Sequence, residues 1–138
     1  MATIQWLGTP EARIISIRKF RQYIDGLPFD KAVQLTRENW DSGPRIKKLQ
    51  FDISKIVEWP TPWDLFGQNI FCANAQALGF FYTLVLSEHS KKHDIKLAII
   101  EDVIMGEKPA IVLDNCPIME TVSAVYGSVD IKEKLGEG

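Results

Sequence analysis

The sequence predicts an α+β fold, in which helices of the N-terminal half pack on a three-stranded antiparallel β meander and a C-terminal helix follows. Apolar residues recur at helical spacing in much of the chain before residue 79. Short β-branched runs separated by turn residues then occupy residues 80–114. A further segment with helical spacing begins near residue 115. Helices followed by a run of strands are typical of α+β domains.

A single domain is expected for residues 1–138. The chain is 46% hydrophobic and 25% charged, which is ordinary for one globular domain of 138 residues. We divide it into a mainly helical part (1–79), antiparallel strands (80–114) and a C-terminal helix and tail (115–138). No apolar run has the length of a signal peptide or a membrane span, so we expect a cytosolic protein that does not associate with membranes.

Two helices are predicted before residue 45. Thr9 and Pro10 have the form of an N-cap and a first helical residue, and apolar residues continue to Gly26. Residues 13–17, RIISI, are equally compatible with a short strand. Pro28 opens the second helix, which ends at residues 42–44. The apolar face of this helix comprises Phe29, Ala32, Val33, Thr36 and Trp40. Residues 45–58 show only a short alternation that an ordered loop also explains.

Residues 58–79 predict two short helices. Thr61, Pro62 and Asp64 form a capping-box pattern, and the helix that they open ends at Gly67. Asn69 is expected to cap the next helix, which contains Cys72 and closes at Gly79. This helix carries few polar side chains, so we expect it to be enclosed on most sides.

The strands are expected at residues 80–88, 95–103 and 109–114, with turns at SKKHD and at MGEK (residues 105–108). A hairpin turn at MGEK would place Asp114 opposite Ile99, several residues away from His93. The last helix is expected to begin near Asn115 and to stop at Gly127. Its inward residues would be Ile118, Met119, Val122 and Val125.

Cys72, His93 and Asp114 are the candidate catalytic residues. A cysteine in the first turn of a helix meets unpaired N–H groups that favour its thiolate. Together with the following histidine and acid, residues 59–115 resemble the core of transglutaminase-like (papain-like) cysteine enzymes. This resemblance implies a thiol hydrolase or acyltransferase with Cys72 as nucleophile, His93 as base and Asp114 as the group that orients the imidazole. The alternative is that Cys72 is a small apolar residue of the core.

A second resemblance covers more of the chain. Trp40, Pro44, the block WPTPWDL (residues 59–65), Phe71-Cys72 and the segment ALGFFYTLVLSEH (residues 77–89) are similar to small proteins of tailed bacteriophages. The resemblance implies a phage origin and hence a place in the cytoplasm of an infected host cell or in the virion. It implies hardly any particular activity, because those proteins are mostly uncharacterised.

Two groups of residues are candidates for binding a partner. Arg13, Arg18, Lys19 and Arg21 concentrate positive charge, either as a patch for an acidic partner or as a solvated helix face. Trp59 and Trp63 are either core residues or anchors on a partner surface. The net charge of −2 argues against nucleic acid as the partner.

The sequence contains no P-loop, no dinucleotide-type glycine pattern and no Cys-x-x-Cys pair, so we expect no cofactor and no metal. We therefore expect a non-enzymatic interaction or structural protein that acts by contact with other proteins, including phage virion proteins. The thiol enzyme is the alternative hypothesis.

Overall fold

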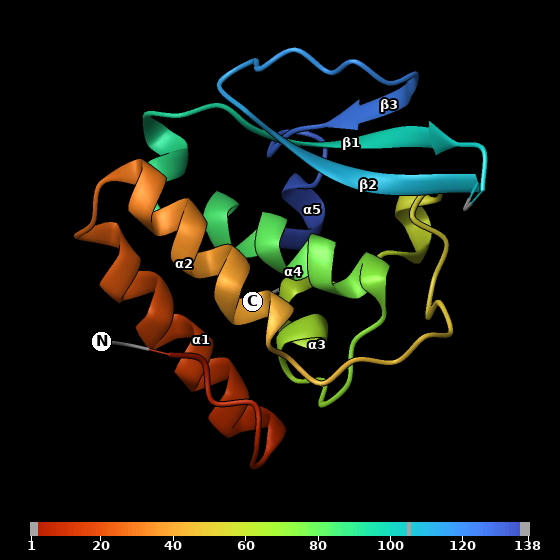
Figure 1. The fold of residues 1–138 in the computed structure, drawn as a ribbon. Helices are drawn as coiled ribbons and strands as arrows, with labels where there is room; N and C mark the ends of the chain where they lie inside the picture. Colours follow the sequence, from red (N-terminus) through yellow and green to blue (C-terminus); the bar gives the residue numbers. More distant parts are fainter. Residues whose placement is uncertain (1–2, 105, 136–138) are drawn as a thin grey trace.

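The three-stranded antiparallel sheet has β1 at its centre. The computed structural model describes residues 3–104 and 106–135. In it β1 (Ile95–Asp102) pairs with β2 (Gly106–Leu113) on one edge and with β3 (Val122–Tyr126) on the other (Figure 1). The α+β class is confirmed. The antiparallel pairing of residues 95–103 with residues 109–114 is also confirmed, as the pairing of β1 with β2. The expected meander is wrong, because the strand order is β2-β1-β3.

The helices of the N-terminal half lie on one side of the sheet (Figure 1). They are α1 (Pro10–Asp25), α2 (Phe29–Asp41), α3 (Pro62–Phe66) and α4 (Ala73–Val85), with the short 3₁₀ helices η1 (Ile56–Glu58) and η2 (Glu88–Lys91). The predicted caps are confirmed: the Thr9 hydroxyl accepts from Ala12 N and the Thr61 hydroxyl accepts from Asp64 N. Residues 13–17 are helical, not a strand.

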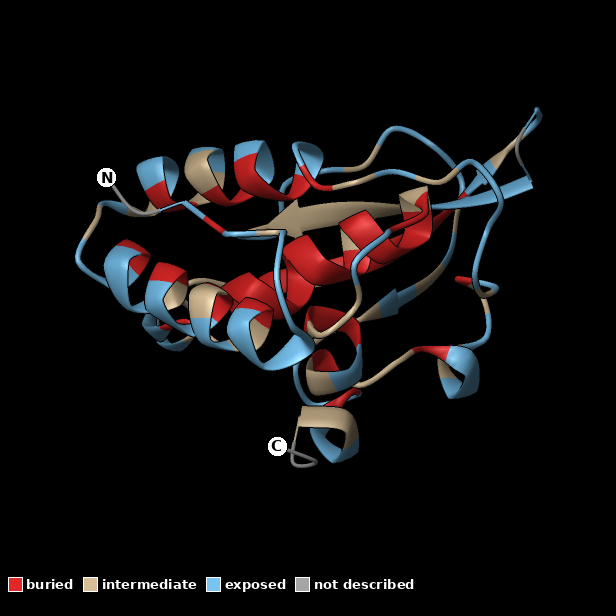
Figure 2. Ribbon diagram, turned by 90° about the horizontal axis from the view of Figure 1, so that it is seen from below, coloured by how far each residue is buried: buried red, intermediate tan, exposed pale blue. Residues whose placement is uncertain are grey.

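Helix α4 is the centre of the molecule and is buried along almost its whole length (Figure 2). It packs against α2 as well as against β1 and β2. The expected strand at residues 80–88 is therefore wrong, because this segment is the second half of α4 followed by the start of η2. A helix enclosed on all sides has a continuous apolar sequence, and such a run carries no periodicity that distinguishes it from a buried strand.

Gly79 lies within α4 and does not end it. Its backbone passes directly against the indole ring of Trp40, where an added Cβ would lie 2.5 Å from Trp40 Cη2. The glycine is thus required for the close approach of α2 and α4. The predicted helix end at this residue is wrong for that reason.

The described segment after β2 contains no helix before β3, so the expected helix from Asn115 to Gly127 is wrong. Residues 114–121 return the chain to the other end of the sheet, where β3 begins opposite Ile100. Burial alternates along β3, as in a strand with one face against the core. The C-terminal helix is instead α5 (Lys132–Leu135), and residues 136–138 of the predicted tail lie outside the described residues.

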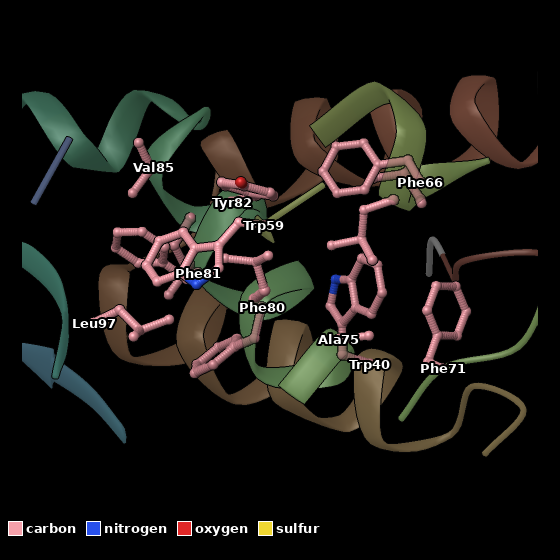
Figure 3. Close-up of a cluster of buried hydrophobic side chains, with 14 of the residues drawn as sticks. Trp40, Trp59, Phe66, Phe71, Ala75, Phe80, Phe81, Tyr82, Val85 and Leu97 are labelled. Carbon is pink, nitrogen blue, oxygen red and sulfur yellow. The ribbon is translucent and has the colours of Figure 1, made fainter. Parts of the chain in front are cut away.

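Aromatic rings fill the space between the helices (Figure 3). Trp40 contacts Trp6 and Phe71 edge-on, with ring centroids 4.9 and 5.3 Å apart. Toward the sheet, Trp59 meets Tyr126 at 5.1 Å. The phenol of Tyr82 donates to Pro60 O over 2.7 Å, and burial raises the pKa of this phenol. Among the helices of the described residues, none combines the length and apolarity needed to cross a membrane.

Candidate functional site

His93 and Asp114 lie side by side where β1 begins and β2 ends. His93 Nδ1 is 2.9 Å from Asp114 Oδ2, and the other carboxylate oxygen accepts from the Asp94 amide at 2.9 Å. The expectation that these two residues are far apart is wrong. Gly106 pairs with Asp102, which places Leu113 opposite Ile95 and brings Asp114 next to His93. Gly106, Glu107 and Lys108 of the expected turn lie in β2, and Met105 lies outside the described residues.

A tight turn fixes the Asp114 carboxylate. Asp114 and Asn115 have φ of 51° and 59°, and Cys116 N donates to Leu113 O at 3.1 Å. Two successive positive φ values with this hydrogen bond have the form of a type I′ turn, in which Asp and Asn are well tolerated. The turn and two hydrogen bonds therefore hold the carboxylate against the imidazole.

The imidazole of His93 is also held by an aromatic stack. Its ring lies parallel to that of Phe29, with centroids 3.8 Å apart and an interplanar angle of 7°. His89 lies nearby, and its Nε2 is 2.8 Å from Ile24 O. This cluster connects the end of α1 and the start of α2 to the sheet, which gives His93 and Asp114 a structural role.

A cavity of about 380 Å³ adjoins His93. Its wall includes Val85, Lys96 and Asp130, and Lys96 is paired with Asp94 at 3.2 Å. The His93 side chain is 31% exposed, and its Nε2 has no hydrogen bond among the described residues. An imidazole oriented through Nδ1 by a carboxylate is able to exchange a proton at Nε2. The pair thus has the geometry of a general base, but a thiol site also needs a cysteine within reach of that base.

Cys72 lies at the opposite end of α4 from this pair. Helix α4 has 13 residues and so is about 20 Å long. Cys72 precedes its first turn, whereas Val85, its last residue, lines the cavity beside His93. Figure 3 shows Phe71 and Val85 at opposite sides of the cluster. The three predicted catalytic residues are therefore not brought together.

The Cys72 thiol is a structural cap. The residue is 0% exposed, its Sγ accepts from Ala75 N at 3.3 Å, and its amide donates to Gln50 Oε1 at 3.0 Å. Cys72 is thus itself the N-cap of α4, and the expected cap at Asn69 is wrong. The backbone is still extended at Phe71, which forms a parallel β-bridge with Arg45. Cys116 is the exposed thiol.

The four basic residues of α1 do not form one surface. Arg13 is buried, and its guanidinium donates to Gly67 O and Gly8 O, each at 2.6 Å. Arg21 is half-buried, 5.8 Å above the ring of Trp63, and burial together with Arg18 lowers the pKa of this guanidinium. Arg18 and Lys19 remain exposed.

Both candidate tryptophan anchors belong largely to the interior. Trp59 is 3% exposed and donates to Ile53 O at 3.0 Å. Trp63 is half-buried and packs edge-on against Phe66. Trp59 is therefore enclosed, and Trp63 is only partly accessible to a partner.

Comparisons of the chain with protein-family models, curated proteins and solved structures find no match. Within residues 3–104 and 106–135, no group of three or more His, Cys, Asp or Glu side chains is placed to hold a metal ion.

Sequence reasoning missed two surfaces that the structure presents. One is the tip of the β1–β2 hairpin, where Val103 and Ile104 are exposed. An apolar pair at this position of the turn was a usable signal, because turns are commonly polar. The other is a cleft lined by Arg37 and Arg45. These residues lie on separate elements, so no local pattern joins them.

Replacing Asp114 with asparagine is expected to reduce the acid sensitivity of folding. The hydrogen bond with His93 and then that from Asp94 N lower the pKa of Asp114 from its ordinary 3.8. The unfolded chain therefore takes up this proton first, so the stabilisation is complete above the ordinary pKa and disappears as the pH falls through the lowered one. Urea denaturation at several pH values between about pH 5 and pH 3 measures the slope of the free energy of unfolding against pH.

The matched control for this variant is Glu120→Gln, which removes an exposed carboxylate from the connection between β2 and β3. Its slope should equal that of the unmodified chain. Equal slopes for Asp114→Asn and the unmodified chain would contradict a stabilising bond between Asp114 and His93.

Proposed function

We propose that this chain is a non-enzymatic interaction domain that contacts a partner protein through the tip of its β1–β2 hairpin. The observation that carries the proposal is the exposure of two adjacent branched side chains: Val103 is 106% exposed and Ile104 is 90% exposed. Burying an aliphatic side chain of this size contributes roughly 1.5–3 kcal/mol. Contact with a partner would supply that burial.

The tip stands on a braced hairpin. Ile104 N donates to Asp102 Oδ1 at 2.9 Å, and Asp102 is paired with Lys108 of the next strand at 3.2 Å. Hairpin turns usually carry Gly, Asn or Asp, because these residues tolerate the backbone angles of the turn and are compatible with exposure to water. Val and Ile at the tip have no such advantage, which supports a role in contact.

The isolation of Cys72 supports contact over thiol chemistry. An active thiol needs access and a base within hydrogen-bond reach. Cys72 is buried, and His93 lies beyond the far end of α4. The resemblance to tailed-bacteriophage proteins points to virion proteins as partners, met in the infected host cell or in the virion itself.

Photo-crosslinking tests the hairpin tip. A benzoylphenylalanine at position 103 should give discrete crosslinked products with a partner protein in cells that produce the chain. The same amino acid at position 57 is the control, because Val57 is also apolar and 85% exposed but lies on η1. Ile104→Ser should weaken the products from position 103. Products of the same identity and yield from both positions, or none from position 103, would overturn the proposal.

Iodoacetamide labelling tests the thiol alternative. In a Cys116→Ser background at about pH 6.5, below the ordinary thiol pKa, Cys72 should react only after denaturant is added, because the native thiol is enclosed. Mass spectrometry of samples quenched at successive times reports the rate at which Cys72 is alkylated. Rapid labelling of the folded chain that slows strongly in His93→Ala would refute the contact proposal in favour of an enzyme.

A further inference from the structure

A cleft of about 460 Å³ runs between α2, the first turns of α4 and the edge strand β2. Two arginines line it: Arg37 comes from α2, and Arg45 comes from the segment that follows this helix. The floor contains Ala77, Phe80 and Ile111. The cleft therefore combines two arginine residues with apolar lining residues.

The Arg37 side chain and the backbone at Arg45 are positioned before any ligand binds. The Arg37 guanidinium lies 5.5 Å from the centroid of the Phe80 ring, a cation–π distance that holds the side chain over the floor. The backbone at Arg45 is fixed by its bridge to Phe71, in which Ile46 N donates to Phe71 O at 2.9 Å. A preorganised side chain such as that of Arg37 loses less conformational entropy when a ligand binds.

The charge of the cleft suits one monoanionic group. Within the described residues, no ion pair involves Arg37 or Arg45. Asp41 also lines the cleft, so two guanidinium charges and one carboxylate leave a net charge of +1. Ala73, the first residue of α4, lies at the same cleft and adds the positive end of the helix dipole.

The carboxylate of an aspartate or glutamate matches this arrangement. Guanidinium groups bind carboxylates through paired N–H···O bonds, and apolar neighbours of the acidic residue would cover the floor. A dianionic phosphate would meet the same arginines, but its two negative charges exceed the net charge of +1 in the cleft and are repelled more strongly by Asp41.

We propose that the Arg37–Arg45 cleft binds an acidic side chain, flanked by apolar residues, of a partner protein. The proposal rests on the proposed function, contact with another protein, and adds a second contact surface and its chemistry. β2 forms one wall and is an edge strand, but Pro109 lacks the N–H needed for continuous strand addition. Recognition is therefore by side chains in the cleft.

Titration followed by ¹H–¹⁵N NMR tests the cleft. The probe is a capped peptide Gly-Leu-Glu-Leu-Gly, with Gly-Leu-Gln-Leu-Gly as its neutral match and inorganic phosphate as a third ligand. The glutamate peptide should shift the amide signals of Ala73, Gln76 and Ile111 in a saturable way. The glutamine peptide lacks the negative charge and should bind the unmodified chain about tenfold more weakly. The double variant Arg37→Gln/Arg45→Gln lacks the positive charges and should bind the glutamate peptide about tenfold more weakly.

Arg18→Gln is the control variant, because Arg18 is an exposed arginine of α1 and does not line the cleft. Its affinity for the glutamate peptide should equal that of the unmodified chain. Equal binding of both peptides, an undiminished affinity in the double variant, or tighter saturation by phosphate would overturn the proposal.

The two proposals fail separately. Discrete crosslinks from position 103 without saturable peptide binding would refute the proposal for the cleft and leave the proposed contact function standing. Saturable, arginine-dependent peptide binding without crosslinks from position 103 would refute the proposal that the hairpin tip is the contact surface.

Discussion

Replacing Trp40 with alanine is expected to lower the free energy of unfolding by about 3–5 kcal/mol, the usual range for a buried Trp or Phe. Trp40 is 1% exposed, and its ring lies among Trp6, Phe66 and Phe71. Alanine would leave a large cavity between α2 and α4. Because domains of this size are stable by only about 5–15 kcal/mol, the variant should be close to unfolding.

A lost hydrogen bond adds to this cost. Trp40 Nε1 donates to Thr83 Oγ1 at 2.9 Å, and the same hydroxyl donates to Gly79 O at 2.7 Å. Trp40→Phe keeps much of the packing and loses this bond, so it should fall between the unmodified chain and Trp40→Ala in urea denaturation. A loss below about 1.5 kcal/mol in Trp40→Ala would contradict a well-packed core at this position.

Replacing Gly79 with alanine is the second change with a large expected effect. Alanine stabilises a solvent-exposed helix by about 1 kcal/mol relative to glycine. Here its Cβ would lie 2.5 Å from Trp40 Cη2 and 2.6 Å from Cε3, and closer still to Cζ3. The enclosed ring cannot move aside freely, so overpacking should destabilise the chain by about 1–3 kcal/mol or more.

A double-mutant cycle isolates this contact. In a Trp40→Leu background the flat ring is gone, so Gly79→Ala should be far less harmful there than in the unmodified chain. Thermal or urea unfolding of the four proteins gives the coupling energy. A cost of Gly79→Ala that is the same in both backgrounds would show that the Trp40 ring is not its cause.

Much of the helical half was predictable because its signals are local. Thr9 and Thr61 each cap a helix through an atom three residues away, and a proline follows each of them. The apolar face of α2 repeats at helical spacing because one side of that helix faces water. The β-branched residues of β1 likewise indicated a strand, and its pairing with β2 follows from their proximity in the chain.

The candidate catalytic residues show where local signals fail. The sequence singled out His93 and Asp114, but only the position of the hairpin turn decides which residues face each other across β1 and β2. The same sequence reasoning joined Cys72 to this pair. The length of α4 separates them, because the helix continues past Gly79 to Val85.

The α+β class, the capped helix starts and the central β-branched strand follow from the sequence, since each signal lies in residues that are close together in the chain or in the order of such segments. Tertiary structure decided that residues 80–85 are helical, that Gly79 accommodates Trp40, and that Cys72 is enclosed. It also brought Arg37 and Arg45 to one cleft. These features depend on contacts between segments far apart in the chain, because close packing, not local propensity, selects among conformations that an apolar run permits equally.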